Sequence, residues 1–178
     1  MKLPSLIDIV WSAGFFDGEG SVILVPTKNT KRGRNYNLRI TMGSTYLPAL
    51  LRLKELWATG HISPYKATPR RKPMWVWNIH SNNACRILEH IFPYLHIKKS
   101  EAYFGIVFQH WKKRDSGLWG RSGRPMRSFI LENQCKLLLP SCRSADLTEV
   151  GKKLEEILGT QQLQFRGEKE VTYAESRS

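Results

Sequence analysis

One acidic side chain near the N-terminus, Glu19, lies in a setting that suits metal-dependent chemistry. The segment around it runs from Trp11 to Ser21 and reads Trp-Ser-Ala-Gly-Phe-Phe-Asp-Gly-Glu-Gly-Ser, so Glu19 stands between two glycines. If two copies of this segment met, their two carboxylates could share metal ions. Glu19 is therefore the first candidate for a catalytic residue.

A helix is expected to carry this carboxylate. Ser5, with Asp8 three residues later, has the pattern of a capping box ahead of an apolar run, which predicts a helix start near Ser5. We expect the helix to stop near Asp17, because Gly18 and Gly20 provide the permissive backbone at which helices end. The carboxylate would then lie on a turn that leads into a strand.

Small residues on this helix would let another backbone approach closely. Ala13, Gly14 and Gly18 have the spacing of one helical face, as in helix pairs that pack through small residues. A tight contact with the chain's own core is the alternative interpretation. The carboxylate at the helix end favours the helix pair, with Ala13, Gly14 and Gly18 at a dimer interface.

The motif resembles a known family signature. Residues 12–20, Ser-Ala-Gly-Phe-Phe-Asp-Gly-Glu-Gly, are similar to the signature of the LAGLIDADG homing endonucleases, with Ser12 at the leading Leu position and Glu19 at the last acidic one. The chain from about Leu6 to Trp111 also follows the family order of helix, two strands, helix, two strands and helices. The resemblance implies an α+β fold with a saddle-shaped antiparallel sheet and C-terminal helices.

The periodicity of the sequence gives the expected elements. Strands are expected at residues 21–27, 37–42, 61–65 and 74–79, and helices at residues 47–57, from Asn82 or Asn83 to Pro93, from about 98 to 111, 128–139 and 145–158. Gly60 is expected to end the helix at 47–57. We divide the chain into a core domain (1–114), a basic loop (115–127, with basic residues from Lys112 onward), a helical extension (128–160) and a polar tail (161–178).

Strict alternation predicts which strand residues face outward. Polar residues alternate with Leu38, Ile40 and Met42 at Asn37, Arg39 and Thr41. In the last strand we expect Trp75, Trp77 and Ile79 to face the core and Val76 and Asn78 to face outward, although the reverse register is possible.

Charge points to a polyanionic partner. The chain of 178 residues has a net charge of +13, and residues 1–131 contain 21 Lys or Arg against 7 acidic residues. Glu55 is the only acidic residue between Gly20 and Leu88, a region with twelve basic residues. Nucleic acid is the expected partner, and a merely well-solvated basic surface is the alternative.

Other sequence features exclude several classes of protein. No apolar run reaches membrane-spanning length and no signal sequence is recognisable, so we expect a soluble, intracellular protein without a membrane partner. Cys85, Cys135 and Cys142 form no Cys-x-x-Cys pair and are interpreted as reduced, mostly buried thiols. The five histidines lack metal-ligand spacing and are interpreted as surface or core residues.

The resemblance assigns roles to individual residues. It implies that Glu19 binds metal, together with the backbone carbonyl of Gly18, and that Asp17 has a mainly structural role. Lys98 follows a Pro-aromatic-Leu turn, as a basic residue does in the family, and is the candidate that polarises water or stabilises the phosphate. A helix-terminal surface lysine is the alternative. Ser44, or Thr45 next to it, matches weakly the polar position that orients solvent.

Because the chain has one motif, the resemblance implies a homodimer in which each subunit supplies half of the active site. The implied partner is double-stranded DNA with a pseudo-palindromic sequence, and the implied cofactor is Mg²⁺, with Mn²⁺ able to substitute and Ca²⁺ supporting binding without cleavage. Base-reading and phosphate-binding candidates lie on the outward strand positions and in the hairpin loops: Ile23, Val25, Thr27, Lys28, Lys31, Arg32, Arg34, Asn37, Arg39, Thr41, His61, Ser63, Tyr65, Lys66, Arg70, Arg71, Lys72 and Asn78.

The expected function is site-specific DNA cleavage in intron or intein homing. A non-cleaving nucleic-acid binder of the same fold, either an RNA splicing maturase or a transcription regulator, is the leading alternative, and Glu19 together with Lys98 favours the nuclease. A purely structural domain would leave the charge asymmetry unexplained.

Overall fold

The computed structural model describes residues 3–27, 35–66, 72–117 and 126–159 and has the expected order of elements. The helices and strands are α1 (Leu6–Glu19), β1 (Gly20–Pro26), β2 (Tyr36–Ser44), α2 (Leu47–Trp57), β3 (His61–Tyr65), β4 (Met74–His80), α3 (Ser81–Ile91), η1 (Phe92–Tyr94), α4 (Lys99–Gly117), α5 (Met126–Leu138), η2 (Leu139–Arg143) and α6 (Leu147–Leu158). Within the described ranges, no helix is both long enough and apolar enough to span a lipid bilayer.

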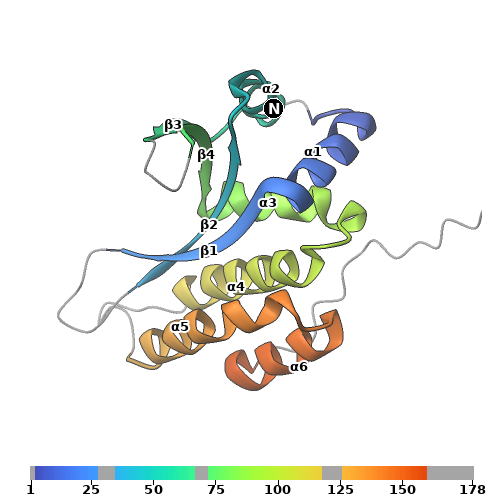
Figure 1. Ribbon diagram of the computed structural model, residues 1–178. Coiled ribbons are helices and arrows are strands. Elements are labelled where there is room, and N and C mark those ends of the chain that lie inside the picture. Colours follow the sequence, from blue (N-terminus) through green and yellow to red (C-terminus); the bar gives the residue numbers. More distant parts are fainter. Residues whose placement is uncertain (1–2, 28–34, 67–71, 118–125, 160–178) are drawn as a thin grey trace, which may run out of the picture.

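The four strands form one antiparallel sheet in the order β1-β2-β4-β3. Helices α1 to α4 contact one face of this sheet, and Figure 1 shows α4 beneath β1 and β2, with α5 and α6 beneath α4 in turn. The other face carries no helix in the described part of the chain. This arrangement confirms the predicted α+β fold.

Alternation decides which side chains face the helices. Leu38, Ile40 and Met42 are fully buried, whereas the intervening polar residues of β2 are half-buried on the open face. In β4 the buried residues are Trp77 and Ile79, so the predicted register is confirmed and the reverse register is wrong.

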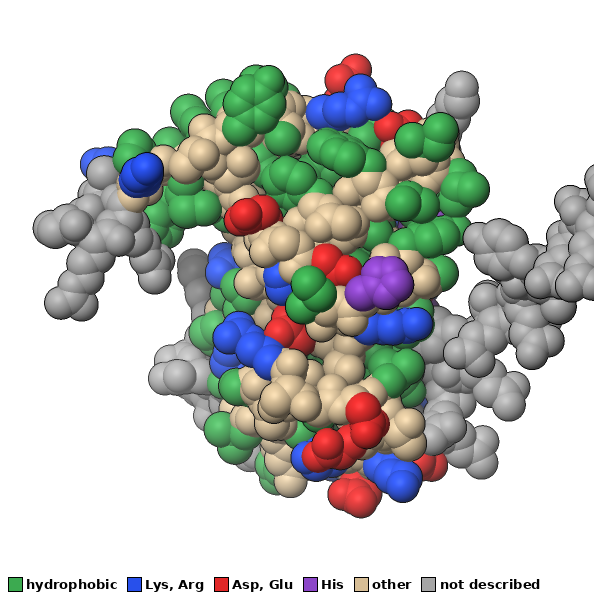
Figure 2. Space-filling model, turned by 45° about the vertical axis from the view of Figure 1, so that its right-hand side comes forward, with side chains coloured by type: hydrophobic (Ala, Val, Ile, Leu, Met, Phe, Trp, Pro, Cys, Tyr) green, Lys and Arg blue, Asp and Glu red, His purple; other side chains and the backbone are tan. Residues whose placement is uncertain are grey.

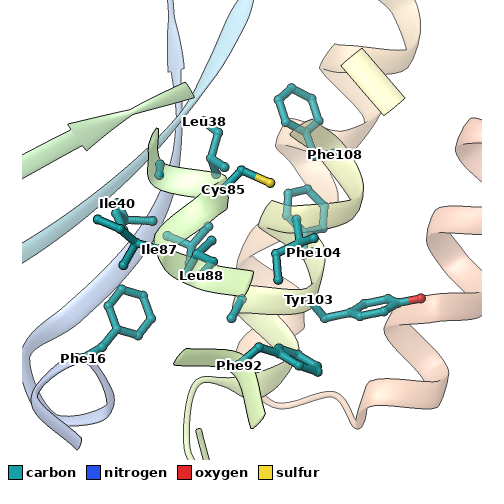
Figure 3. Packing of buried hydrophobic residues seen from close by; sticks show 14 of the residues in the cluster. Phe16, Leu38, Ile40, Cys85, Ile87, Leu88, Phe92, Tyr103, Phe104 and Phe108 are labelled. Carbon is teal, nitrogen blue, oxygen red and sulfur yellow. The ribbon is translucent and has the colours of Figure 1, made fainter. Parts of the chain in front are cut away.

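The core lies between the sheet, α3 and α4 (Figure 3). Phe104 and Phe108 of α4 stack with ring centroids 6.3 Å apart and are both fully buried. Gly105 lies in the same helix, where an added Cβ would be 3.0 Å from Leu88 and 3.1 Å from both Leu38 and Val22. The missing side chain therefore lets α4 lie close against α3 and the sheet.

Helix α1 runs further than the sequence predicted. It continues through Gly18 to Glu19, and β1 begins at once with Gly20. Gly20 has extended backbone angles (φ −81°, ψ 158°), but a Cβ there would lie 2.4 Å from the Phe16 ring. Gly20 is needed for close packing against Phe16, and the expected helix stop near Asp17 is wrong.

Three other expected boundaries differ from the structure. Helix α2 ends at Trp57 with Ala58 in the left-handed region (φ 46°), so Gly60 is not the residue that ends it. The N-cap of α3 is His80, and neither Asn82 nor Asn83 caps the helix. Helix α4 continues to Gly117, beyond the expected end near residue 111 and into the expected basic loop.

The C-terminal helices brace the sheet through a buried carboxylate. Glu132 of α5 is fully buried, and its Oε2 accepts a hydrogen bond from the Tyr36 backbone N–H at 2.6 Å. Its other oxygen lies 3.4 Å from the Lys112 ammonium, which also donates to the Tyr36 carbonyl and to Asn37 Oδ1. The ion pair therefore ties α5 and α4 to the start of β2.

Replacing this carboxylate should destabilise the fold. We expect Glu132→Gln to lower the free energy of unfolding by about 3 kcal/mol, because the Lys112 ammonium would lose this buried carboxylate and the Tyr36 N–H would lose a charged acceptor. Urea denaturation measures the change. Glu149→Gln is the matched control, since its pair with Lys153 is exposed and should contribute little. Equal stability of the two variants would contradict the bracing role of Glu132.

Candidate functional site

The end of α1 and the start of α4 cap each other. The Asp17 carboxylate accepts hydrogen bonds from the backbone N–H groups of His96 (2.8 Å) and Lys98 (2.9 Å). These groups precede α4, where backbone donors have no partner within the helix. Asp17 is buried and its carboxylate faces inward, which agrees with the structural role expected for it.

Lys98 in turn contacts the C-terminal end of α1. Its ammonium donates to the carbonyl oxygens of Phe16 (3.3 Å), Asp17 (2.7 Å) and Gly18 (3.3 Å). The C-terminus of a helix carries partial negative charge, so a cation there is stabilising. Lys98 is thus a helix cap in the described structure, and its charge lies next to the predicted metal ligand Gly18.

Glu19 differs from Asp17 in having its carboxylate free. It is exposed at the last position of α1, and no described residue makes a hydrogen bond or ion pair with it. The adjacent Gly18 carbonyl supplies a second oxygen at the same helix end. Oxygen donors of these two kinds suit a hard divalent cation such as Mg²⁺, so the residues present fit the predicted metal.

The exposed side of α1 contains the two glycines. A Cβ at Gly14 or Gly18 would meet nothing within 4 Å, so both open onto space rather than onto the chain's own core. Ala13 is fully buried, and its predicted place at a dimer interface is wrong because it packs inward. Large apolar residues share the exposed side at helical spacing, namely Ile7, Val10 and Trp11, and Leu3 is exposed just ahead of the helix. Figure 2 shows hydrophobic side chains gathered over the upper part of the molecule, where α1 and α2 lie.

Ser12, which stands at the leading Leu position of the motif, makes hydrogen bonds that explain a serine at this buried site. Ser12 is fully buried, and its hydroxyl donates to the Asp8 carbonyl (2.7 Å) and accepts from the Trp57 indole N–H (3.1 Å). Both hydrogen-bonding functions of the serine are satisfied, so α1 and α2 are joined by a polar contact at this position.

Ser44, the candidate for orienting solvent, makes a hydrogen bond within its own turn. It continues the helix-facing series of β2, and its hydroxyl accepts a hydrogen bond from the Tyr46 backbone N–H at 3.0 Å. The sheet alternation therefore directs Ser44 away from the open face. The contact shapes the turn into α2, while Thr45 next to it is exposed.

Most described base-reading candidates lie on the open face. The strand register places Ser21, Thr41, Asn78 and His61 in one row across all four strands. The same face carries Ile23, Val25, Asn37, Arg39, Ser63 and Tyr65, and Thr27, Lys66 and Lys72 adjoin it at strand ends. The predicted residues Lys28, Lys31, Arg32, Arg34, Arg70 and Arg71 lie outside the described residues.

His80 is an open-face residue that the sequence reasoning missed. It pairs with Arg39 across β2 and β4, and partial burial together with the Arg39 charge lowers the pKa of its imidazole. The neutral imidazole can therefore donate and accept hydrogen bonds at neutral pH. Extending the outward series Val76, Asn78 by one more alternate position would have found it.

The two acidic residues of the motif should respond oppositely to neutralisation. We expect Asp17→Asn to lower the free energy of unfolding by about 2 kcal/mol, because an amide cannot accept both backbone hydrogen bonds as well as a carboxylate does. Glu19→Gln should leave stability within about 0.5 kcal/mol of the parent, since the side chain is exposed. Thermal and urea unfolding would test the pair, and a strongly destabilised Glu19→Gln protein would contradict this division of roles.

Solved structures with the same fold were found by structural comparison. I-CvuI, a homing endonuclease solved with its target in the presence of 2 mM Ca, is 15% identical with a TM-score of 0.58, over 85% of this chain and 94% of that chain. I-Vdi141I, an archaeal intron-encoded homing endonuclease solved with DNA, is 13% identical with a TM-score of 0.61, over 85% and 96%. The meganuclease I-SmaMI, bound to DNA, is 15% identical with a TM-score of 0.58, over 80% of this chain but 47% of that chain.

At these identities the structures establish the fold alone. No curated protein sequence matched the chain. The family model described as LAGLIDADG endonuclease matches residues 12–114, which include the motif, the whole sheet and most of α4. The chain belongs to the LAGLIDADG endonuclease family.

Proposed function

We propose that this protein is a site-specific DNA endonuclease that uses a divalent metal ion and acts as a homodimer. Its reaction is a double-strand break in a long pseudo-palindromic target, as required for intron or intein homing. The observation that carries the proposal is the exposed carboxylate of Glu19, which no described residue binds, at the end of α1 where the open sheet begins.

The open face suits the major groove of DNA. A row across four strands spans about 14 Å at the usual strand spacing, close to the groove width of about 12 Å. The row Ser21, Thr41, Asn78 and His61 offers hydroxyl, amide and imidazole groups that can read base edges. Arg39 adds a guanidinium whose Nε is buried without a hydrogen-bond partner in the described structure, while its remaining donors can bind guanine or phosphate.

The metal would bind at the end of α1. Glu19 and the Gly18 carbonyl would hold Mg²⁺, which in such a site polarises the phosphate and activates water. Lys98 keeps the carbonyl end of α1 ordered and places a fixed positive charge beside it, where it can stabilise charge that develops on a phosphate. The negative end of the helix favours both cations.

A homodimer would complete the site. The chain contains one motif, and it covers nearly all of I-CvuI and I-Vdi141I but about half of I-SmaMI. The exposed apolar side of α1, with Gly14 and Gly18 open, would pair with its symmetry mate and bring the two Glu19 carboxylates together. Two-fold symmetry then predicts two half-sites in the target.

A non-cleaving binder is the second candidate, and one observation favours it. The Lys98 ammonium donates hydrogen bonds to three carbonyl oxygens, including that of Gly18. In the described structure the Lys98 ammonium and the Gly18 carbonyl are therefore already bonded to each other. A splicing maturase or a transcription regulator would need only the sheet and the dimer. Cleavage of target DNA by the parent protein distinguishes the two candidates.

Neutralising Glu19 should separate cleavage from binding. We expect Glu19→Gln to abolish cleavage in Mg²⁺ while DNA affinity in Ca²⁺ holds or rises, because two clustered carboxylates no longer repel the phosphates. The assay follows linearisation of a plasmid that carries the insertion site of the protein's own gene. A variant that cuts at the parental rate would remove Glu19 from the active site.

Filling the glycine surface of α1 should block dimerisation without harming the fold. A Cβ at position 14 would meet no described atom within 4 Å, so we expect the Gly14→Leu monomer to remain folded while the dimer weakens. Gly14→Ala, with a smaller side chain, should have a lesser effect. Sedimentation with and without DNA measures the association, and a parent protein that stays monomeric in both conditions would contradict the homodimer.

A further inference from the structure

Three potential metal ligands meet on the side of the molecule that faces away from the open sheet. Cys85 and Glu89 lie one turn apart on α3, and His110 approaches them from α4. One ligand atom from each residue lies within 4.8 Å of the other two. This cluster is separate from the motif helix and takes no part in the proposed cleavage site.

We propose that Cys85, Glu89 and His110 form a binding site for a borderline divalent cation of the Zn²⁺ class. Sulfur, carboxylate oxygen and imidazole nitrogen together are donors that such ions prefer, whereas Mg²⁺ and Ca²⁺ prefer oxygen alone. Three protein ligands leave one tetrahedral position for water. The inference is independent of the cleavage proposal, because the two sites share no residue.

The geometry needs only side-chain adjustment to accept an ion. Ligand atoms about 2.0 Å from a tetrahedral metal are about 3.3 Å apart, and somewhat further apart where one of them is sulfur. The Cys85 sulfur lies 3.7 Å from Glu89 Oε1, which already fits. His110 Nε2 lies 2.5 Å from the same oxygen and must move outward, which its half-exposed side chain permits.

Backbone positions of the two helices are fixed around the cluster. Gln109, next to His110, donates a hydrogen bond to the Asn82 side chain of α3 at 2.9 Å. Cys85 is buried and points from α3 toward α4, beside Phe108 (Figure 3). The thiol therefore forms the inner wall of the site, with Glu89 and His110 at the solvent side.

Binding would exchange protons without any redox step. Burial, with help from Glu89, raises the pKa of the Cys85 thiol to about 12, so the free thiol is protonated at neutral pH. The metal–sulfur bond would replace the S–H bond, and the proton would leave to solvent. His110 would bind as the neutral imidazole, so a dication with the thiolate and carboxylate forms a neutral centre. The nearby Lys113 favours the thiolate.

Cobalt titration tests the site directly. The protein, without a histidine tag and treated with chelator, is titrated with Co²⁺, whose bond to a thiolate gives a near-ultraviolet charge-transfer band. We expect one equivalent of Co²⁺ per chain with this band, lost on adding Zn²⁺. Cys85→Ser should abolish the band, and His110→Gln, a surface change, should weaken binding by at least about tenfold.

Matched controls separate this site from other thiols and from the cleavage site. Cys142→Ser changes another buried thiol, and Glu19→Gln changes the motif carboxylate, so both variants should keep the band. Cobalt binding without the band, or a band that survives Cys85→Ser, would overturn the proposal. If Glu19→Gln loses Mg²⁺-dependent cleavage but keeps the cobalt band, the cleavage site and the cobalt site are independent of each other.

Discussion

The reciprocal capping of α1 and α4 is the contact on which the candidate site depends. A helix N-terminus leaves backbone N–H donors without partners, and a helix C-terminus leaves carbonyl acceptors without partners. One end of each kind meets the other here. Asp17 supplies acceptors to the donors that precede α4, and Lys98 supplies donors to the carbonyls that end α1. Glu19 follows two residues after Asp17, with an exposed carboxylate that no described residue binds. Asp17 therefore has the structural role, and Glu19 has the proposed role in metal binding.

The C-terminal helices support the sheet from its helix-covered side, and the opposite face of the sheet is open. Alternation buries one side chain series against α3 and α4 and leaves polar groups along the other face. The buried pair of Glu132 and Lys112 fixes α4 and α5 against the start of β2, near the open-face residues Asn37 and Arg39. The extension after the core therefore supports the surface proposed to read DNA.

Local patterns predicted the sheet well, because a strand's alternation directly reports which side is buried. The local patterns failed at residues whose surroundings depend on contacts between segments that are distant in the sequence. Ala13 has the size for a dimer contact, but the core packing of α1 buries it. The hydrogen bond between the Ser44 hydroxyl and the Tyr46 backbone was likewise not visible in the motif match. The grouping of Cys85 with His110 depends on two helices packing together, so their separation in sequence conceals it.

The central claim is that two subunits share one cleavage centre, and a mixed dimer tests it most directly. A dimer of one parent subunit and one Glu19→Gln subunit, purified with two different tags, is assayed on supercoiled plasmid carrying a target selected from random DNA in Ca²⁺. The account predicts that the mixed dimer binds like the parent but fails to linearise the plasmid at the parental rate. Linearisation at the parental rate would show that one carboxylate suffices and would contradict the shared site.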